Sequence, residues 1–275
     1  MIQISNLSFS YGKKEVLANI SLTLPKGRII GLLGENGVGK TTLLTLLCGL
    51  KYPAYGEILT DGHHPFDRER SLLAKQFYLP DEVSPLRVTA ASFGLSRSSF
   101  WPKFSMDMYL DLLKELEVHP DDRMDKMSAG QLKKAWLAFG LACQADYYYM
   151  DEPTNGLDIP SKAQFRRILS RVCTEDTTFV ISTHQVRDLE EVLDSVVVLE
   201  SREVVVNATI NEITDKFYFE YAMTLSPEAI YSEMTAAGIL QVLPNKDGRD
   251  SRLHLEAFFN AIHKDKSRVL SIMNS

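Results

Sequence analysis

The eight residues GENGVGKT, Gly34 to Thr41, constrain the fold more than any other stretch of the chain. They match the pattern G-x-x-x-x-G-K-[ST], follow the apolar run RIIGLL and precede the leucine-rich segment TTLLTLLCGL. A strand, a glycine-rich loop and a helix in this order surround a phosphate with backbone N–H groups. Coincidence would give such a match in about one chain in a hundred of this length. We therefore predict a phosphate-binding loop in an α/β fold.

The residues of this loop are suited to a nucleotide with bound Mg²⁺. The glycines let backbone N–H groups turn inward, Lys40 can reach the β- and γ-phosphates, and the Thr41 hydroxyl can hold the metal ion. We expect the nucleotide to contact Gly34, Asn36, Gly37, Gly39, Lys40, Thr41 and Thr42.

Two adjacent acids end a second strand-like run, YYYMDEPTNGLD, at residues 147–158. A nucleotide in a phosphate-binding loop needs a second anchor for Mg²⁺ and a base for the attacking water. We expect Asp151 to hold the metal through its water shell and Glu152 to polarise the water. Alone, an acidic pair after a strand is more often a surface feature, but beside the phosphate-binding loop the catalytic interpretation is favoured.

Composition limits the remaining possibilities. The 275 residues are 45% hydrophobic with a formal net charge of −6, which gives no general attraction for nucleic acid. No window reaches the roughly 18 apolar residues that a membrane-spanning helix needs, and the N-terminus lacks a secretory pattern, so we expect a cytoplasmic protein. Cys48, Cys143 and Cys173 lack metal-binding spacing. His63 and His64 are adjacent in a polar turn with no third ligand, which disfavours a metal site.

The order of segments predicts a mainly parallel core sheet flanked by helices. Antiparallel strands precede it at the N-terminus, and a helical subdomain is expected at about 72–129. We place this main domain at 1–212 and a small α+β domain at 213–275. In that tail we expect strands at KFYFEYAM and ILQVLP and helices at SPEAIYSEMTAAG and LEAFFNAIHKD.

Three further stretches carry a family resemblance: MSAGQ at 127–131, PTNGLD at 153–158, and ISTHQ with His184. Together with the phosphate-binding loop and the acidic pair, they resemble, in chain order, the Walker A, signature, Walker B, D-loop and switch histidine of ABC-type ATPases. The chain is thus similar over about 1–210 to the ATP-binding subunit of an ABC transporter, which implies ATP and Mg²⁺ as cofactors.

The resemblance implies further roles for single residues. Tyr11 would stack on adenine, Asp158 would communicate across a dimer, and His184 would contact the γ-phosphate and steady the attacking water. The partner would be a second copy or a related ATPase subunit, arranged head to tail. The signature of one subunit would then cover ATP held by the other, through Ser128, Ala129, Gly130 and Gln131.

Two positions depart from the family pattern. The signature commonly reads LSGGQ, whereas Met127 and Ala129 stand here, and the Ala129 methyl group lies where backbone and nucleotide approach closely. The family usually carries a metal-contacting glutamine after the proline of YLPDEVSP, but this chain has Asp81. Asp81 can still bind the metal or its water, with Glu82 or Gln76 as substitutes.

The resemblance also implies a separate transmembrane permease, which would hold the chain at the inner face of the membrane. The segment FWPKFSMDMYLDLLKELEV looks most like bacterial ABC-2 export systems. We expect the docking groove at about 81–104 with Trp101 as an anchor, although these aromatic residues could equally form a local core. The alternatives are a soluble non-transport ABC ATPase, disfavoured by the single phosphate-binding loop, and a regulatory module without hydrolysis, disfavoured by Glu152 and His184.

Overall fold

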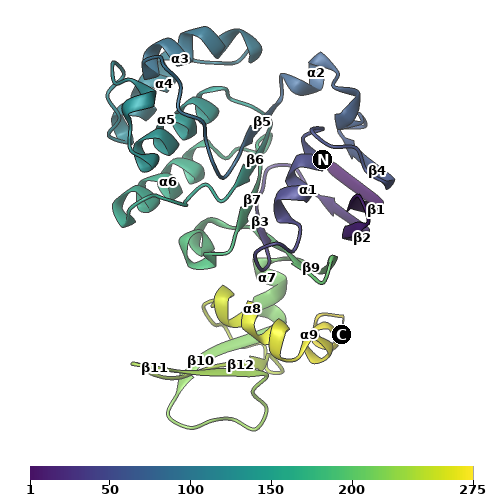
Figure 1. The fold of residues 1–275 in the computed structure, drawn as a ribbon. Coiled ribbons are helices and arrows are strands. Elements are labelled where there is room, and N and C mark those ends of the chain that lie inside the picture. The colour runs from purple at the N-terminus through teal and green to yellow at the C-terminus, as the bar shows by residue number, and fades with distance from the viewer. Residues whose placement is uncertain (275) are drawn as a thin grey trace.

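The structure, a computed structural model that describes residues 1–274, is built around a six-stranded sheet (Figure 1). Its strands follow the order β5 (Gln76–Leu79), β6 (Tyr147–Asp151), β7 (Thr178–Thr183), β3 (Ile29–Leu33), β8 (Ser195–Glu200) and β9 (Glu203–Thr209). The first five are parallel and β9 runs antiparallel to β8. Strands β3, β6 and β7 are buried along their whole length, which explains their continuous apolar sequences.

Two strands at the N-terminus form an antiparallel sheet, as predicted, and a third strand at 55–60 joins them. This sheet has the order β2 (Lys14–Leu24), β1 (Ile2–Tyr11) and β4 (Tyr55–Thr60). Helix α1 (Lys40–Leu47) lies between this sheet and the central one (Figure 1). Its leucines share a buried cluster with residues of β1, β2 and β3, so the helix that follows the phosphate-binding loop is packed from both sides.

Helices gather on the other side of the central sheet. They are α3 (Ala90–Arg97), α4 (Met106–Glu115), α5 (Ala129–Ala142) and α6 (Ile159–Val172). Short helical turns complete this main part at η1 (Pro65–Asp67), α2 (Arg70–Leu73), η2 (Ser98–Phe100), η3 (Met124–Lys126), η4 (Val186–Asp188) and η5 (Glu190–Val192). The sequence predicts helical and irregular structure throughout 72–129, which is wrong for β5. Four residues are too few for a periodic signal, and pairing with β6 sets their conformation.

The C-terminal tail, from β10 onward, follows helix α7 (Ile210–Lys216). It contains the sheet β10 (Phe217–Ala222), β12 (Gly238–Pro244) and β11 (Tyr231–Thr235), then α8 (Leu255–Lys264) and α9 (Lys266–Met273). The helix predicted at SPEAIYSEMTAAG is wrong, because this segment holds the edge strand β11, which pairs with β12. Tertiary pairing overrides the local preference there.

The tail packs on the main domain through a shared core. Phe217 and Phe258 belong to the same buried cluster as Leu189 and Ile213. The predicted boundary at 212–213 falls inside α7. No helix within residues 1–274 is long and apolar enough to cross a membrane.

Candidate nucleotide site

The loop between β3 and α1 has the backbone that a phosphate-binding loop requires. Gly37 has a φ of 81° and Gly39 a φ of 119°, in the region that favours glycine. A Cβ on Gly39 would lie 2.8 Å from a methyl group of Leu17 and 3.3 Å from the carbonyl oxygen of Val16, and the φ value itself would strain any other residue. Lys40 turns back over the loop and donates from Nζ to the carbonyl oxygens of Gly34 at 2.7 Å and Glu35 at 3.1 Å.

Asp151 lies at the end of β6 and is bound by two hydroxyl groups. Thr41 Oγ1 donates to Asp151 Oδ2 at 2.6 Å, and Ser182 Oγ donates to Oδ1. The structure therefore brings together two of the three residues expected to contact Mg²⁺, which are 110 positions apart in the sequence. Asp151 is only 3% exposed, so these hydroxyl groups replace most of its solvation by water.

Glu152 is turned away from its neighbour by an unusual backbone conformation. Its φ is 45°, in the left-handed region, and its N–H donates to Ser182 at 3.1 Å. Its Oε1 lies 2.8 Å from His184 Nδ1 and 3.9 Å from Lys40 Nζ. Burial lowers the pKa of Lys40, and the charges of Glu152 and Asp151 oppose this shift. The expected base, the switch histidine and the loop lysine thus form one group.

These residues surround a pocket of about 280 Å³. Its lining comprises Tyr11, Lys14, Val16, Asn36, Gly37, Gly39, Lys40, Thr41, Thr42, Asp81, Asp151 and Glu152. Tyr11 lies half-exposed at the edge of the pocket, where the Tyr11 hydroxyl is 3.4 Å from Thr42 Oγ1. Lys51 Nζ lies 4.9 Å from the centre of the Tyr11 ring. Most residues predicted to bind nucleotide and metal therefore meet in one place.

The signature residues line a different surface. None of residues 128–131 is part of this pocket. Ser128 caps α5 and forms a reciprocal capping pair with Gln131. A Cβ on Gly130 would lie 2.8 Å from the carbonyl oxygen of Gly156, so the helix start packs tightly on the turn after β6. Asp158, on the far side of that turn, caps α6 by accepting from Ser161 N–H at 2.9 Å.

Sequence reasoning missed several residues around the site. Ser182 gives no signal because it lies inside an apolar strand, where one serine is unremarkable. Lys133 is only 2% exposed and donates from Nζ to the carbonyl oxygens of Pro80 at 3.2 Å and Asp81 at 2.6 Å. Its place in the apolar run QLKKAWLAFGLA is the signal that could have found it. Burial lowers the pKa of Lys133, against the opposing charge of Asp81. Asn155 Nδ2 donates to Asp81 Oδ1 at 3.0 Å.

Trp101 does not stand out from the surface as the docking prediction requires. Its Nε1 donates to the carbonyl oxygen of Gln76 at 2.9 Å, and its ring packs 5.6 Å from that of Phe139. Phe100 beside it is 62% exposed. Both line an apolar groove of about 440 Å³, in which Leu50 is also exposed. Trp101 therefore forms part of the local core, whereas the Phe100 side chain stays at the surface of the groove.

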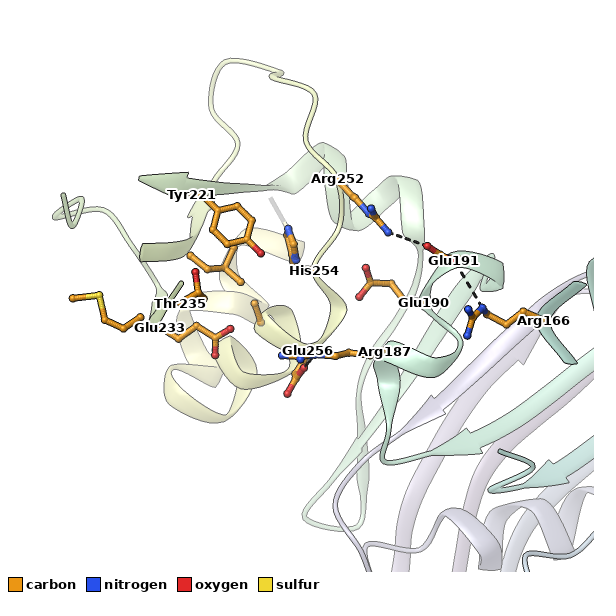
Figure 2. Close-up of a pocket in the computed structure, with 13 residues that line it drawn as sticks. Arg166, Arg187, Glu190, Glu191, Tyr221, Glu233, Thr235, Arg252, His254 and Glu256 are labelled. Atoms are coloured by element: carbon orange, nitrogen blue, oxygen red, sulfur yellow. Dashed lines mark hydrogen bonds and ion pairs between the residues drawn. The ribbon is translucent and has the colours of Figure 1, made fainter. Parts of the chain in front are cut away.

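A second cavity, of about 690 Å³, separates the tail from the segment that follows His184 (Figure 2). Ion pairs cross it: Arg187 with Glu256, and Arg252 with Glu191 at 3.1 Å. Glu190 Oε2 accepts from the N–H of Leu255 at 2.9 Å, which caps α8 from the other side of the cavity. The tail therefore contacts the main domain directly after the switch histidine.

Comparison with known proteins agrees with this geometry. The family model described as ABC transporter matches residues 17–155. The petrobactin import ATP-binding protein YclP of Bacillus subtilis (strain 168) is 29% identical over 243 residues, which cover 84% of this chain and 96% of that protein. The ABC transporter ATP-binding protein NatA of the same organism is 30% identical over 229 residues, covering 78% and 91%.

Solved structures show the same fold. An ATP-binding subunit of an ABC transporter aligns with a TM-score of 0.71 at 22% identity, covering 78% of this chain and 91% of that one. A dimeric ATP-binding cassette in a post-hydrolysis state, bound to ADP and Pi, aligns with a TM-score of 0.68 at 21% identity, covering 76% and 99%.

The fold and the pocket define a P-loop ATPase. More narrowly, the chain belongs to the ABC transporter family, and it is an ATP-binding, ATP-hydrolysing subunit of that family.

Proposed function

We propose that the chain binds Mg-ATP between two head-to-tail subunits and uses its hydrolysis to drive a separate transmembrane permease. One observation carries this proposal. The Thr41 and Asp151 pair, Lys40 and Glu152 line a single pocket. His184 is not part of that lining, but its Nδ1 lies 2.8 Å from Glu152 Oε1. A phosphate-binding loop, a metal anchor and a base are the parts that phosphoryl transfer to water requires.

The residues present fit Mg²⁺. Thr41 and Asp151 offer hydroxyl and carboxylate oxygens, the ligand type that Mg²⁺ prefers, and the ion usually keeps several waters. Asp81 lines the same pocket, and its Oδ1 is bound to Asn155, so we propose that it contacts the water shell through Oδ2. The bound ion would neutralise charge on the phosphate oxygens.

For the protein's own residues, we propose a division of labour. Lys40 binds the β- and γ-phosphates, and Tyr11 stacks on the adenine. Glu152 accepts a hydrogen bond from the attacking water and orients it, while His184 holds the Glu152 carboxylate through Nδ1. Because Glu152 is only 7% exposed, bulk water does not compete for most of its carboxylate.

The placement of the signature supports a dimer. Ser128 and Gly130 lie at the start of a helix of 14 residues, where N–H groups and the helix dipole favour an anion. They lie outside their own chain's pocket, so we propose that they contact the γ-phosphate of ATP bound by the partner, with Ala129 and Gln131 beside them. Asp158 lies close to the same turn and would face the second subunit.

For the permease contact we propose the groove lined by Leu50 and Phe100, at the inner face of the membrane. Exposed aromatic side chains beside an apolar groove are favoured anchors for a helix of a partner protein. We also propose an export system of the ABC-2 type, on the segment 100–118 and the short C-terminal tail. The relatives include an import protein and the SkfA peptide export ATP-binding protein SkfE, 31% identical over 205 residues.

Binding and hydrolysis measured on the full chain test the proposal. We expect phosphate release from ATP that needs Mg²⁺ and stops with EDTA. We expect Lys40→Ala to lose ATP binding, because no other side chain of the loop carries positive charge. Unchanged ATP affinity in that variant would contradict the assignment of the pocket. Hydrolysis with no membrane protein co-purifying would instead favour a soluble ABC ATPase.

A further inference from the structure

A chain of polar side chains connects Asp81 to His184 at the rim of the nucleotide pocket. Asn155 Nδ2 donates to Asp81 Oδ1 at 3.0 Å. Gln185 Nε2 lies 3.4 Å from Asn155 Oδ1 and 3.4 Å from His184 Nε2. His184 Nδ1 lies 2.8 Å from Glu152 Oε1. Residues after β5, β6 and β7 therefore form one continuous network that ends on the proposed base.

The contacts of Lys162 and Asp81 orient the donors and acceptors of this network. Lys162 Nζ, which can only donate, lies 3.0 Å from Gln185 Oε1, so the NH₂ group of Gln185 points toward the imidazole. The ionised carboxylate of Asp81 can only accept, so Asn155 offers it the NH₂ group and offers its oxygen to Gln185. With a donor facing Nε2, the imidazole must accept there and carry its proton on Nδ1, where it donates to Glu152.

We propose that Asn155 and Gln185 are positioning residues for ATP hydrolysis, which hold the His184 ring with its Nδ1–H on Glu152. This inference rests on the proposed function, in which Glu152 orients the attacking water. A half-turn of the imidazole would replace Nδ1 by a carbon atom and remove the bond to Glu152. The contact of Gln185 at Nε2 opposes that turn.

Lys162, which contacts the Gln185 side chain, is itself held in place by a second contact. Lys162 Nζ also pairs with Asp188 Oδ2 at 2.7 Å, and both side chains are only 18% exposed. Lys162 is therefore held between two acceptors on either end of the turn after His184. This arrangement keeps the Gln185 amide in one orientation, which a solvent-exposed glutamine would not otherwise maintain.

A charge-swap cycle between residues 81 and 155 tests the network. Asn155→Asp keeps the acceptor for Gln185 but places a carboxylate against Asp81 and removes the donor. We expect kcat to fall about threefold to tenfold, the value of one hydrogen bond, with KM for ATP changed less than about twofold. In the Asp81→Asn background, the same substitution restores a donor and acceptor pair with reversed direction. Relative to Asp81→Asn alone, we expect Asn155→Asp to leave kcat unchanged or to raise it.

Gln185→Glu tests the other half of the network. The variant can still pair with Lys162, but it offers no donor to the imidazole, so we expect kcat to fall as in Asn155→Asp. Asn207→Asp, an exposed position on β9, is the matched control for added charge. Thermal unfolding of each variant checks that the fold is kept.

The outcomes separate this inference from the proposed function. Wild-type kcat in Asn155→Asp and in Gln185→Glu would overturn the positioning role, while a Glu152→Gln variant without turnover would leave the catalytic assignment standing. An equal loss of kcat from Asn155→Asp in the wild-type and the Asp81→Asn backgrounds would also overturn it. The loss would then be independent of a hydrogen-bond donor at residue 81, as a purely structural role of Asn155 predicts. Full turnover in Glu152→Gln would instead contradict the proposed function itself.

Discussion

Replacing Ser182 by alanine removes one of the two donors that bind Asp151. The Ser182 hydroxyl is fully buried, donates to Asp151 Oδ1 and accepts from the N–H of Glu152 at 3.1 Å. A hydrogen bond to a charged group contributes about 1.5 to 3 kcal/mol to stability. At about 2 to 4 °C per kcal/mol for a chain of this size, we expect Tm to fall by roughly 3 to 12 °C.

The same substitution leaves the Asp151 carboxylate with a single donor, Thr41. A loss of about 1.4 kcal/mol in its orientation corresponds to about tenfold in rate, so we expect kcat/KM for Mg-ATP to fall at least tenfold. Calorimetry and a phosphate-release assay measure the two effects. The control is Ser195→Ala on β8, which β3 separates from β7 in the same sheet. Its side chain is buried, and its hydroxyl makes no hydrogen bond among the described residues. Wild-type Tm and turnover in Ser182→Ala would refute the reasoning.

Three further predictions concern other parts of the chain. Phe100→Ala should keep ATP binding but reduce co-purification of the permease. Leu95→Ala, at an exposed position outside the groove, should leave co-purification unchanged, and an equal loss in both variants would contradict the placement of the groove. Truncation after Thr214 should give a less stable protein that still binds ATP, as dye-monitored unfolding and nucleotide titration would show; soluble protein without binding would contradict a separate tail. Burial alone would raise the pKa of Asp61, but hydrogen bonds from the N-terminal amino group, Tyr147 and Lys26 lower this pKa to about 2. The contribution of Asp61 to stability is therefore complete above about pH 4 and lost toward pH 2. Asp61→Asn should lower the free energy of unfolding in urea at pH 7 but not near pH 2. A difference between variant and wild type that is the same at both pH values would contradict this assignment.

The sequence predicted those parts of the protein that local patterns specify. The phosphate-binding loop, α1 and the buried parallel strands follow from glycine placement and apolar runs. Strand β11 was predicted as a helix because SPEAIYSEMTAAG contains good helix formers, and only pairing with β12 makes it a strand. Lone edge strands carry little periodic signal of their own.

The candidate site likewise contains residues that sequence motifs predict and supporting contacts that they do not. Thr41, Asp151 and Glu152 belong to motifs, so their meeting in one pocket could be predicted from those motifs, with His184 beside Glu152. The supporting hydrogen bonds could not, because Ser182 and its contacts depend on which strands are neighbours in the sheet. Register and strand order are properties of the folded chain, and no local pattern in the sequence states them.

The central claim is that Glu152 orients the attacking water in an ATP-bound dimer. The most direct measurement combines turnover with molar mass by light scattering for the full-length Glu152→Gln variant in Mg-ATP. We predict unchanged ATP binding, a loss of turnover by a factor of about 10² or more, and a dimer that persists as long as ATP is present, since the amide cannot serve as a base. Lys40→Ala, in which we expect ATP binding to be lost, should stay monomeric under the same conditions. Turnover near the wild-type rate in Glu152→Gln, or a dimer that forms equally without nucleotide, would contradict the account.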